Sequence, residues 1–117
     1  MITIHGIKTC DTVRRARRWL DEHGVDYRFR DFREQPPTPA ELAAWLQQCD
    51  WQALLNRRST TWKGLPAAAR DAATDAEAAA ALLAAHPTLI KRPVLTGAGD
   101  VEIGFDADRY RALFAAR

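Results

Sequence analysis

The hydrophobic positions at the start of the chain follow first the period of a strand and then that of a helix. Ile2–His5 is predicted to form a short strand, and Thr12–His23 an amphipathic helix that ends at Gly24. A second strand is expected at Tyr27–Phe32, where mixed polar and aromatic residues leave its buried face open. A strand, a helix and a strand this close together imply parallel pairing through a right-handed crossover. The predicted apolar face of the helix consists of Val13, Ala16, Trp19 and Leu20.

The middle of the chain, about residues 38–86, is predicted to be helical throughout. Thr38 has the chemistry of an N-cap, with Pro39 at the first helical position and Glu41 at the third. This helix is expected to run through Cys49, and a short helix is expected at Trp51–Leu55.

A polar segment, Asn56–Thr61, follows without an apolar period and is interpreted as a loop. Leu65-Pro66 then predicts the start of another short helix. Thr74, with Glu77 three residues later, predicts a capping box for the alanine-rich helix Asp75–Ala85. Alanine favours helix formation and close packing and points to no chemistry.

Strand character returns after this helical region. Pro93–Thr96 and Val101–Phe105 flank the glycine-rich turn Gly97–Asp100, a pattern that predicts an antiparallel hairpin. Asp106 is expected to cap a last helix, Ala107–Ala116. The residues predicted to share one face of that helix are Tyr110, Leu113 and Phe114. The expected order is therefore β-α-β, helices, β-β-α.

Length and composition restrict the class of protein. A chain of 117 residues with 47% hydrophobic and 27% charged residues fits one soluble domain with a single core. The sequence has neither a membrane span nor a secretory signal pattern, so a cytoplasmic protein is expected. The net charge of +2 argues against nucleic acid as the main partner. The arginine run that could bind phosphate, or simply face solvent, is Arg14, Arg15, Arg17 and Arg18.

Cysteine and histidine usage argues against a disulfide framework and a metal centre. Cys10 and Cys49 are too few for a scaffold, and Val13 stands where a C-x-x-C pair would carry its second cysteine. The three histidines are scattered without ligand spacing, so no metal site is predicted.

Cys10 is the strongest candidate for chemistry because it lies between the first strand and the first helix. A thiol at a helix N-terminus faces backbone N–H groups and the positive end of the helix dipole, which favour the nucleophilic thiolate. The neighbours Lys8, Thr9 and Thr12 are polar, and Arg14 adds positive charge. The alternative is an inert cysteine buried where strand meets helix.

Three sequence blocks, in this order, resemble the arsenate reductase (ArsC)/Spx family of thioredoxin-fold proteins, and most closely its YffB-type branch of small thiol reductases. The blocks are Gly6–Ala16, Leu54–Lys63 and Leu89–Leu95. The resemblance implies a thioredoxin-like (glutaredoxin-like) α/β fold, with a mixed four-stranded sheet and a helical insertion between strands 2 and 3. It also implies that Pro93 is the cis-proline facing the active-site cysteine.

The departures from the family pattern concern arsenate. Family arsenate reductases hold the oxyanion with three arginines, of which Arg92 matches one and Arg57 and Arg58 approximate another. The third would fall near Gly104-Phe105, where the chain has no arginine. The family histidine is also displaced to His5.

The resemblance implies a thiol-dependent reductase that uses glutathione or a glutaredoxin-type reductant, with no tightly bound cofactor. Cys10 is predicted to be the nucleophile and Arg92 to place a cation beside it. The residues predicted to bind the substrate are Lys8, Thr9, Thr12, Arg14, Arg57, Arg58 and Pro93. Cys49 is interpreted as a core residue, with a resolving cysteine as the alternative. Two alternatives stay open: an Spx-like regulator that binds RNA polymerase, and a glutaredoxin-coupled arsenate reductase.

Overall fold

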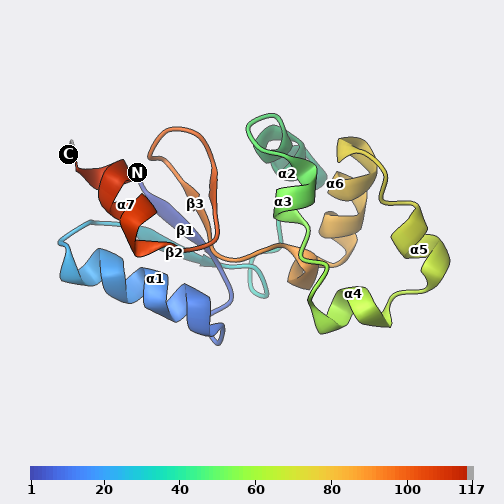
Figure 1. Cartoon of the computed structure of the whole chain (residues 1–117), viewed down its shortest axis with the longest axis horizontal. Coiled ribbons are helices and arrows are strands. Elements are labelled where there is room, and N and C mark those ends of the chain that lie inside the picture. Colours follow the sequence, from blue (N-terminus) through green and yellow to red (C-terminus); the bar gives the residue numbers. More distant parts are fainter. Residues whose placement is uncertain (116–117) are drawn as a thin grey trace. The chain divides into compact units, whose positions relative to one another are not determined.

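The computed structural model describes residues 1–115, which form two compact units (Figure 1). The first unit combines residues 1–35 with the chain from Arg92 onward, and the second is Pro36–Lys91. The second unit therefore interrupts the first between its second and third strands, as the helical insertion was predicted to do.

The first unit contains a mixed four-stranded sheet in the order β2-β1-β3-β4. Its strands are β1 (Thr3–Gly6), β2 (Arg28–Asp31), β3 (Val94–Thr96) and β4 (Glu102–Ile103). β1 pairs in parallel with β2 and antiparallel with β3, and β3 and β4 form the predicted hairpin. β4 is shorter than predicted because Gly104, with φ of 81°, leaves the extended region.

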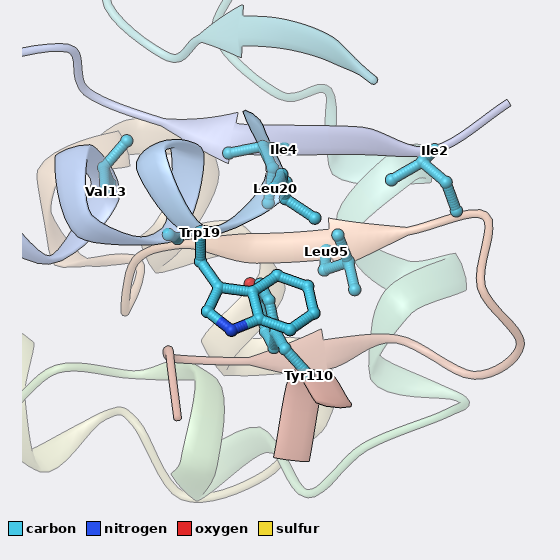
Figure 2. Packing of buried hydrophobic residues seen from close by; sticks show 8 residues of the cluster. Ile2, Ile4, Val13, Trp19, Leu20, Leu95 and Tyr110 are labelled. Carbon is cyan, nitrogen blue, oxygen red and sulfur yellow. The ribbon is translucent and has the colours of Figure 1, made fainter. Parts of the chain in front are cut away.

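Two helices cover the same face of this sheet, α1 (Asp11–Glu22) and α7 (Ala107–Phe114). The core between these helices and the sheet consists of Ile2, Ile4, Val13, Ala16, Trp19, Leu20, Leu95 and Tyr110 (Figure 2). All four apolar positions predicted for α1 are buried, which confirms its amphipathic pattern. Asp106 caps α7 as predicted, accepting a hydrogen bond from the Arg109 N–H. Ala116, the expected last residue of this helix, lies outside the described residues.

The second unit is helical. Its elements are α2 (Pro39–Leu46), α3 (Trp51–Leu54), α4 (Thr60–Gly64), α5 (Ala67–Asp71), α6 (Ala76–Ala85) and a 3-10 turn at Pro87–Leu89. α2 packs against α6, and their buried residues include Leu42, Trp45, Ala79 and Leu83. Leu55 leaves α3 to form an antiparallel bridge with Ile90. No helix within residues 1–115 is long and apolar enough to cross a membrane.

The start of α2 agrees with the prediction and its end does not. The Thr38 hydroxyl accepts from the Glu41 N–H at 3.1 Å, so Thr38 is the N-cap. The helix ends at Leu46 rather than running through Cys49. Cys49 lies in the following turn and is half-buried, so it is not a full core residue. Its thiol donates at 3.3 Å to the Trp45 carbonyl in the last turn of α2, which also accepts from the Gln48 N–H.

Two further predictions in this unit were wrong. The cap of α6 is Asp75, whose carboxylate accepts from the Ala78 N–H at 2.8 Å, and not Thr74 one residue earlier. The end of the polar segment interpreted as a loop forms α4, because the Ser59 hydroxyl accepts from the Trp62 N–H and starts a helical turn.

Candidate active site at the carboxyl end of β1

Cys10 stands one tight turn beyond the carboxyl end of β1. The Cys10 N–H donates to the Ile7 carbonyl at 3.0 Å, which closes a β-turn over Ile7–Cys10. Within residues 1–115 only glycines have positive φ, so the turn is type I rather than type II. α1 begins immediately afterwards, so turn and helix together fix where the cysteine lies.

Cys10 itself occupies the N-cap position of α1, with extended φ and ψ of −80° and 125°. Its side chain makes no capping hydrogen bond, and Thr12, half-buried inside the first turn, does not hold the cap position. The sulfur therefore stands at the positive end of a twelve-residue helix whose N-cap side chain makes no capping hydrogen bond. Cys10 is half-buried against the hydrophobic core, which leaves part of the residue exposed.

β3 brings Arg92 and Pro93 to the same end of the sheet. Gly6 pairs with Asp31 of β2, and His5 pairs with Val94 of β3, so the next antiparallel pair sets Gly6 beside Pro93. The Arg92–Pro93 peptide bond is cis, as the family resemblance implied. Pro93 is buried, its carbonyl accepts from the Gly104 N–H at 2.8 Å, and Arg92 is half-buried.

Gly6 sets the distance between β1 and α1. A Cβ atom on Gly6 would lie 2.6 Å from Val13 Cγ2 and 3.2 Å from Val13 Cγ1. Val13 is fully buried, so the strand and the helix that flank the Cys10 turn meet at a point where only glycine fits.

Asp31 is the residue of this region that sequence reasoning missed. It is 6% exposed, and its carboxylate accepts from the Lys8 N–H at 3.0 Å and the Arg33 N–H at 2.7 Å. Burial alone would raise the pKa of Asp31. The two N–H donors, with the positive charges of Lys8 and Arg33, outweigh burial and hold the pKa below 3.8. An ionised carboxylate is therefore built into the end of β2.

The predicted binding residues around the turn have specific positions. Arg14 lies along the turn, where its Nε donates to the Lys8 carbonyl at 3.2 Å and its guanidinium pairs with Asp11 at 3.6 Å. The Lys8 ammonium is exposed and lies 3.5 Å from the Glu34 carboxylate. Thr9 is exposed at the tip of the turn.

His5 points to the sheet face opposite α1, because Ile4 and Gly6 on either side of it face the helix. It is 6% exposed, its Nε2 lies 2.8 Å from Thr96 Oγ1, and an Arg30 guanidinium nitrogen lies 3.2 Å from its Nδ1. The ring is also stacked on Phe32, with centroids 6.2 Å apart. The His5 side chain is thus held by residues of the first unit.

Arg57 and Arg58 belong to the second unit, where both are exposed. The Arg57 guanidinium lies over the rings of Trp51 and Trp62, at 5.6 and 5.9 Å from their centroids. The Arg58 N–H donates to the Asn56 side chain. That Arg57 and Arg58 bind the substrate of Cys10 stays a prediction.

The second cysteine has a different environment from Cys10. Burial, followed by the negative charge of Asp50, raises the pKa of the Cys49 thiol above its ordinary value of 9.0. Among residues 1–115, no three His, Cys, Asp or Glu side chains form a cluster that could hold a metal ion.

Comparison with known proteins gives one family. The model of the ArsC family matches residues 5–113. An uncharacterized protein of Haemophilus influenzae is 40% identical over 98% of this chain and all of its own length. A more distant relative, 25% identical over 96% of this chain and 85% of its own, is the global transcriptional regulator Spx 2 of Lactococcus lactis.

Solved structures agree with the fold. The structure of a YFFB protein superposes with a TM-score of 0.91 at 41% identity, covering 97% of this chain and 98% of that one. An arsenate reductase (ArsC) related protein from Brucella melitensis is 42% identical, with a TM-score of 0.74 and coverage of 97% and 93%. The predicted thioredoxin-like fold is confirmed.

Proposed function

The chain belongs to the ArsC family, and we propose that it is a thiol reductase with Cys10 as nucleophile and glutathione as co-substrate. The observation that carries the proposal is the place of Cys10, half-buried at the N-cap of α1 with its own side chain making no capping hydrogen bond. A helix N-terminus stabilises an anion at that point, and the anion of a cysteine is the nucleophilic thiolate.

The proposed reaction reduces a mixed disulfide between a substrate and glutathione. The Cys10 thiolate attacks the glutathione sulfur, a Cys10–glutathione disulfide forms, and the substrate leaves as a thiolate that takes a proton from solvent. A second glutathione thiolate then attacks the glutathione sulfur of that adduct, which releases Cys10 as thiolate and glutathione disulfide. Overall, the mixed disulfide and one free glutathione thiol become the substrate thiol and glutathione disulfide, so the disulfide bond passes from the substrate to glutathione and the free glutathione is the reductant.

The resolving thiol in this proposal comes from solution. Val13, at the position of a second motif cysteine, is fully buried on the core face of α1. Cys49 belongs to the second unit, and its raised pKa leaves little thiolate at neutral pH. Free glutathione or a glutaredoxin-type reductant is therefore the proposed second partner, in the cytoplasm, where such thiols are kept reduced.

Arg92 is proposed to supply the cation that binds a glutathione carboxylate. Support comes from the register of β1 and β3, which brings Arg92 and the cis Pro93 to the sheet end from which the Cys10 turn departs. A guanidinium holds a carboxylate through two parallel N–H donors, which a lysine at this position would not reproduce. Lys8 adds an exposed positive charge on the turn.

The direct test is adduct formation with glutathione disulfide, followed by intact-mass and peptide-mass measurement. Wild type and a Cys49→Ala variant are expected to gain one glutathione on Cys10, and added reduced glutathione should remove it. Cys10→Ser should gain none. An adduct that forms equally well on Cys49 in the Cys10→Ser variant would show that Cys10 is not special and would overturn the proposal.

The two alternatives differ from this proposal in what they require of Cys10. A regulator like the Spx relative would retain RNA polymerase on an affinity column, and Cys10→Ser would retain it equally. A glutaredoxin-coupled arsenate reductase would consume reduced glutathione only when arsenate is present, and Arg92→Ala would abolish that consumption. The proposed thiol reductase should consume glutathione with a disulfide substrate and without arsenate.

A further inference from the structure

The turn that carries Cys10 is held by two side chains that bind the backbone N–H and the backbone carbonyl of Lys8. On one side the Asp31 carboxylate accepts from the Lys8 N–H at 3.0 Å, and on the other the Arg14 Nε donates to the Lys8 carbonyl at 3.2 Å. Together with the bond from Cys10 to Ile7, these contacts hold both backbone groups of Lys8 and the two ends of the turn.

Asp31 is the better anchored of the two side chains. Arg14 is exposed, whereas Asp31 is 6% exposed, and its second oxygen accepts from the Arg33 N–H at 2.7 Å. The backbone around it is also fixed, because the Glu34 and Gln35 N–H groups donate to the Asp31 carbonyl. The Lys8 N–H is therefore held by a buried carboxylate whose own residue is fixed by backbone hydrogen bonds.

We propose that Asp31 is a positioning residue for Cys10: its carboxylate, through the Lys8 N–H, fixes the turn so that the sulfur meets a docked disulfide in line. The inference rests on the proposed thiol exchange. Its physical basis is that a disulfide bound on the protein presents its sulfur in one direction, so a small displacement of the thiolate costs much of the rate. A small reagent free in solution can approach from any accessible direction.

The test compares two reactions of the same thiolate in wild type and Asp31→Asn. One is exchange with glutathione disulfide, and the other is alkylation by iodoacetamide, each measured at Cys10 in a Cys49→Ala background. The substitution keeps the shape of the side chain but replaces one acceptor oxygen by an NH₂ donor, which cannot accept from a backbone N–H. We expect the ratio of exchange to alkylation rate to fall roughly tenfold.

The ratio separates positioning from other effects of the substitution. Any change in the thiolate fraction alters both rates alike and cancels, and loss of folded protein is monitored by circular dichroism. Glu34→Gln is the matched control, because it removes one carboxylate charge from the same segment while leaving both acceptors of Asp31 in place. Its ratio is expected to stay within about twofold of wild type, since the turn keeps its anchor.

A second pair of variants tests the same hydrogen bond from the side of its donor, the Lys8 N–H. Lys8 is the second residue of a type I turn, where proline is accepted, so Lys8→Pro deletes the N–H while keeping the turn. Lys8→Ala loses the same side-chain charge and keeps the N–H. The ratio should fall in Lys8→Pro relative to Lys8→Ala, and this pair decides the matter if Asp31→Asn does not fold.

The outcomes of the experiment are distinguishable. If wild type exchanges with glutathione disulfide and the ratio is unchanged in Asp31→Asn and in Lys8→Pro against Lys8→Ala, Asp31 has no positioning role and the proposed function stands. If wild-type Cys10 does not exchange with glutathione disulfide, the proposed function fails and the inference fails with it.

Discussion

Gly6→Ala is expected to destabilise the first unit through a collision with α1. The added Cβ would lie 2.6 Å from Val13 Cγ2, closer than side-chain carbons approach in folded proteins. Val13 cannot turn away readily, because it is fully buried and a β-branched residue in a helix has one strongly preferred rotamer. Overpacking of this kind costs about 1–3 kcal/mol.

A double-mutant cycle with Val13→Ala isolates this collision. Val13→Ala alone removes two buried methyl groups and should cost roughly 2 kcal/mol. In Gly6→Ala/Val13→Ala the methyl groups that collide are gone and the new Cβ fills part of their space. The double variant should therefore be no less stable than Val13→Ala alone, which is a strong departure from additivity.

The assay is amide hydrogen exchange of Ile4 and Leu95, which pair between β1 and β3 and report the first unit. A cost of about 1–3 kcal/mol corresponds to exchange that is faster by about 5- to 150-fold in Gly6→Ala. Unchanged exchange in Gly6→Ala, or costs that simply add in the double variant, would refute the reasoning that close approach requires glycine here.

Three further predictions concern other parts of the structure. Because burial and Asp50 raise the pKa of the Cys49 thiol, the rate of its labelling by iodoacetamide should be low at pH 7 and should reach half of its maximum only above pH 9.0; a half-maximal rate below that pH would contradict the reasoning. Arg17→Ala should cost about 1 kcal/mol in thermal unfolding, since the guanidinium lies 4.1 Å from an aromatic ring centroid, whereas exposed Arg18→Ala should cost little; equal costs would rule out the ring contact. Asp75→Ala should cost about 1 kcal/mol and Thr74→Ala much less, with the reverse order showing that the cap is misassigned.

Much of the fold could be predicted from local sequence patterns. The apolar spacing of α1 fixes which residues are buried, and the caps Thr38 and Asp106 mark the starts of α2 and α7. These features are local, since each depends on residues within one or two helical turns. The parallel pairing of β1 with β2 followed from connectivity, because a short strand-helix-strand segment allows few arrangements.

The errors fall where local rules allow two answers. Thr74 and Asp75 both have oxygen atoms able to cap α6, and only the backbone path decides that Asp75 does so. α4 has no apolar period, so its short helical turn was hidden within a polar segment. Cys49 lies beyond α2 because the helix ends at Leu46, and the two glutamines that follow carry no strong stop signal in the sequence.

The candidate site shows the same division between local and distant contacts. Cys10 was identifiable because its position between strand and helix is a local property. Asp31 could not be identified in this way, since its hydrogen bond to the Lys8 N–H joins positions 23 residues apart. The mixed polar and aromatic pattern of β2 also did not show which of its side chains are buried. Arg14 was expected to add positive charge and to bind the substrate, while in the structure its Nε donates to a backbone carbonyl of the turn.

The position of β1 in the sheet has a consequence for the order in which the chain can fold during synthesis. Its parallel partner β2 emerges from the ribosome soon after it, whereas its antiparallel partner β3 follows only after the whole second unit. At about 5–20 residues per second, that delay lasts several seconds. During this time one edge of β1, a strand that includes the apolar Ile4, has no strand beside it, so the nascent chain offers an open edge to other chains until Val94–Thr96 arrives.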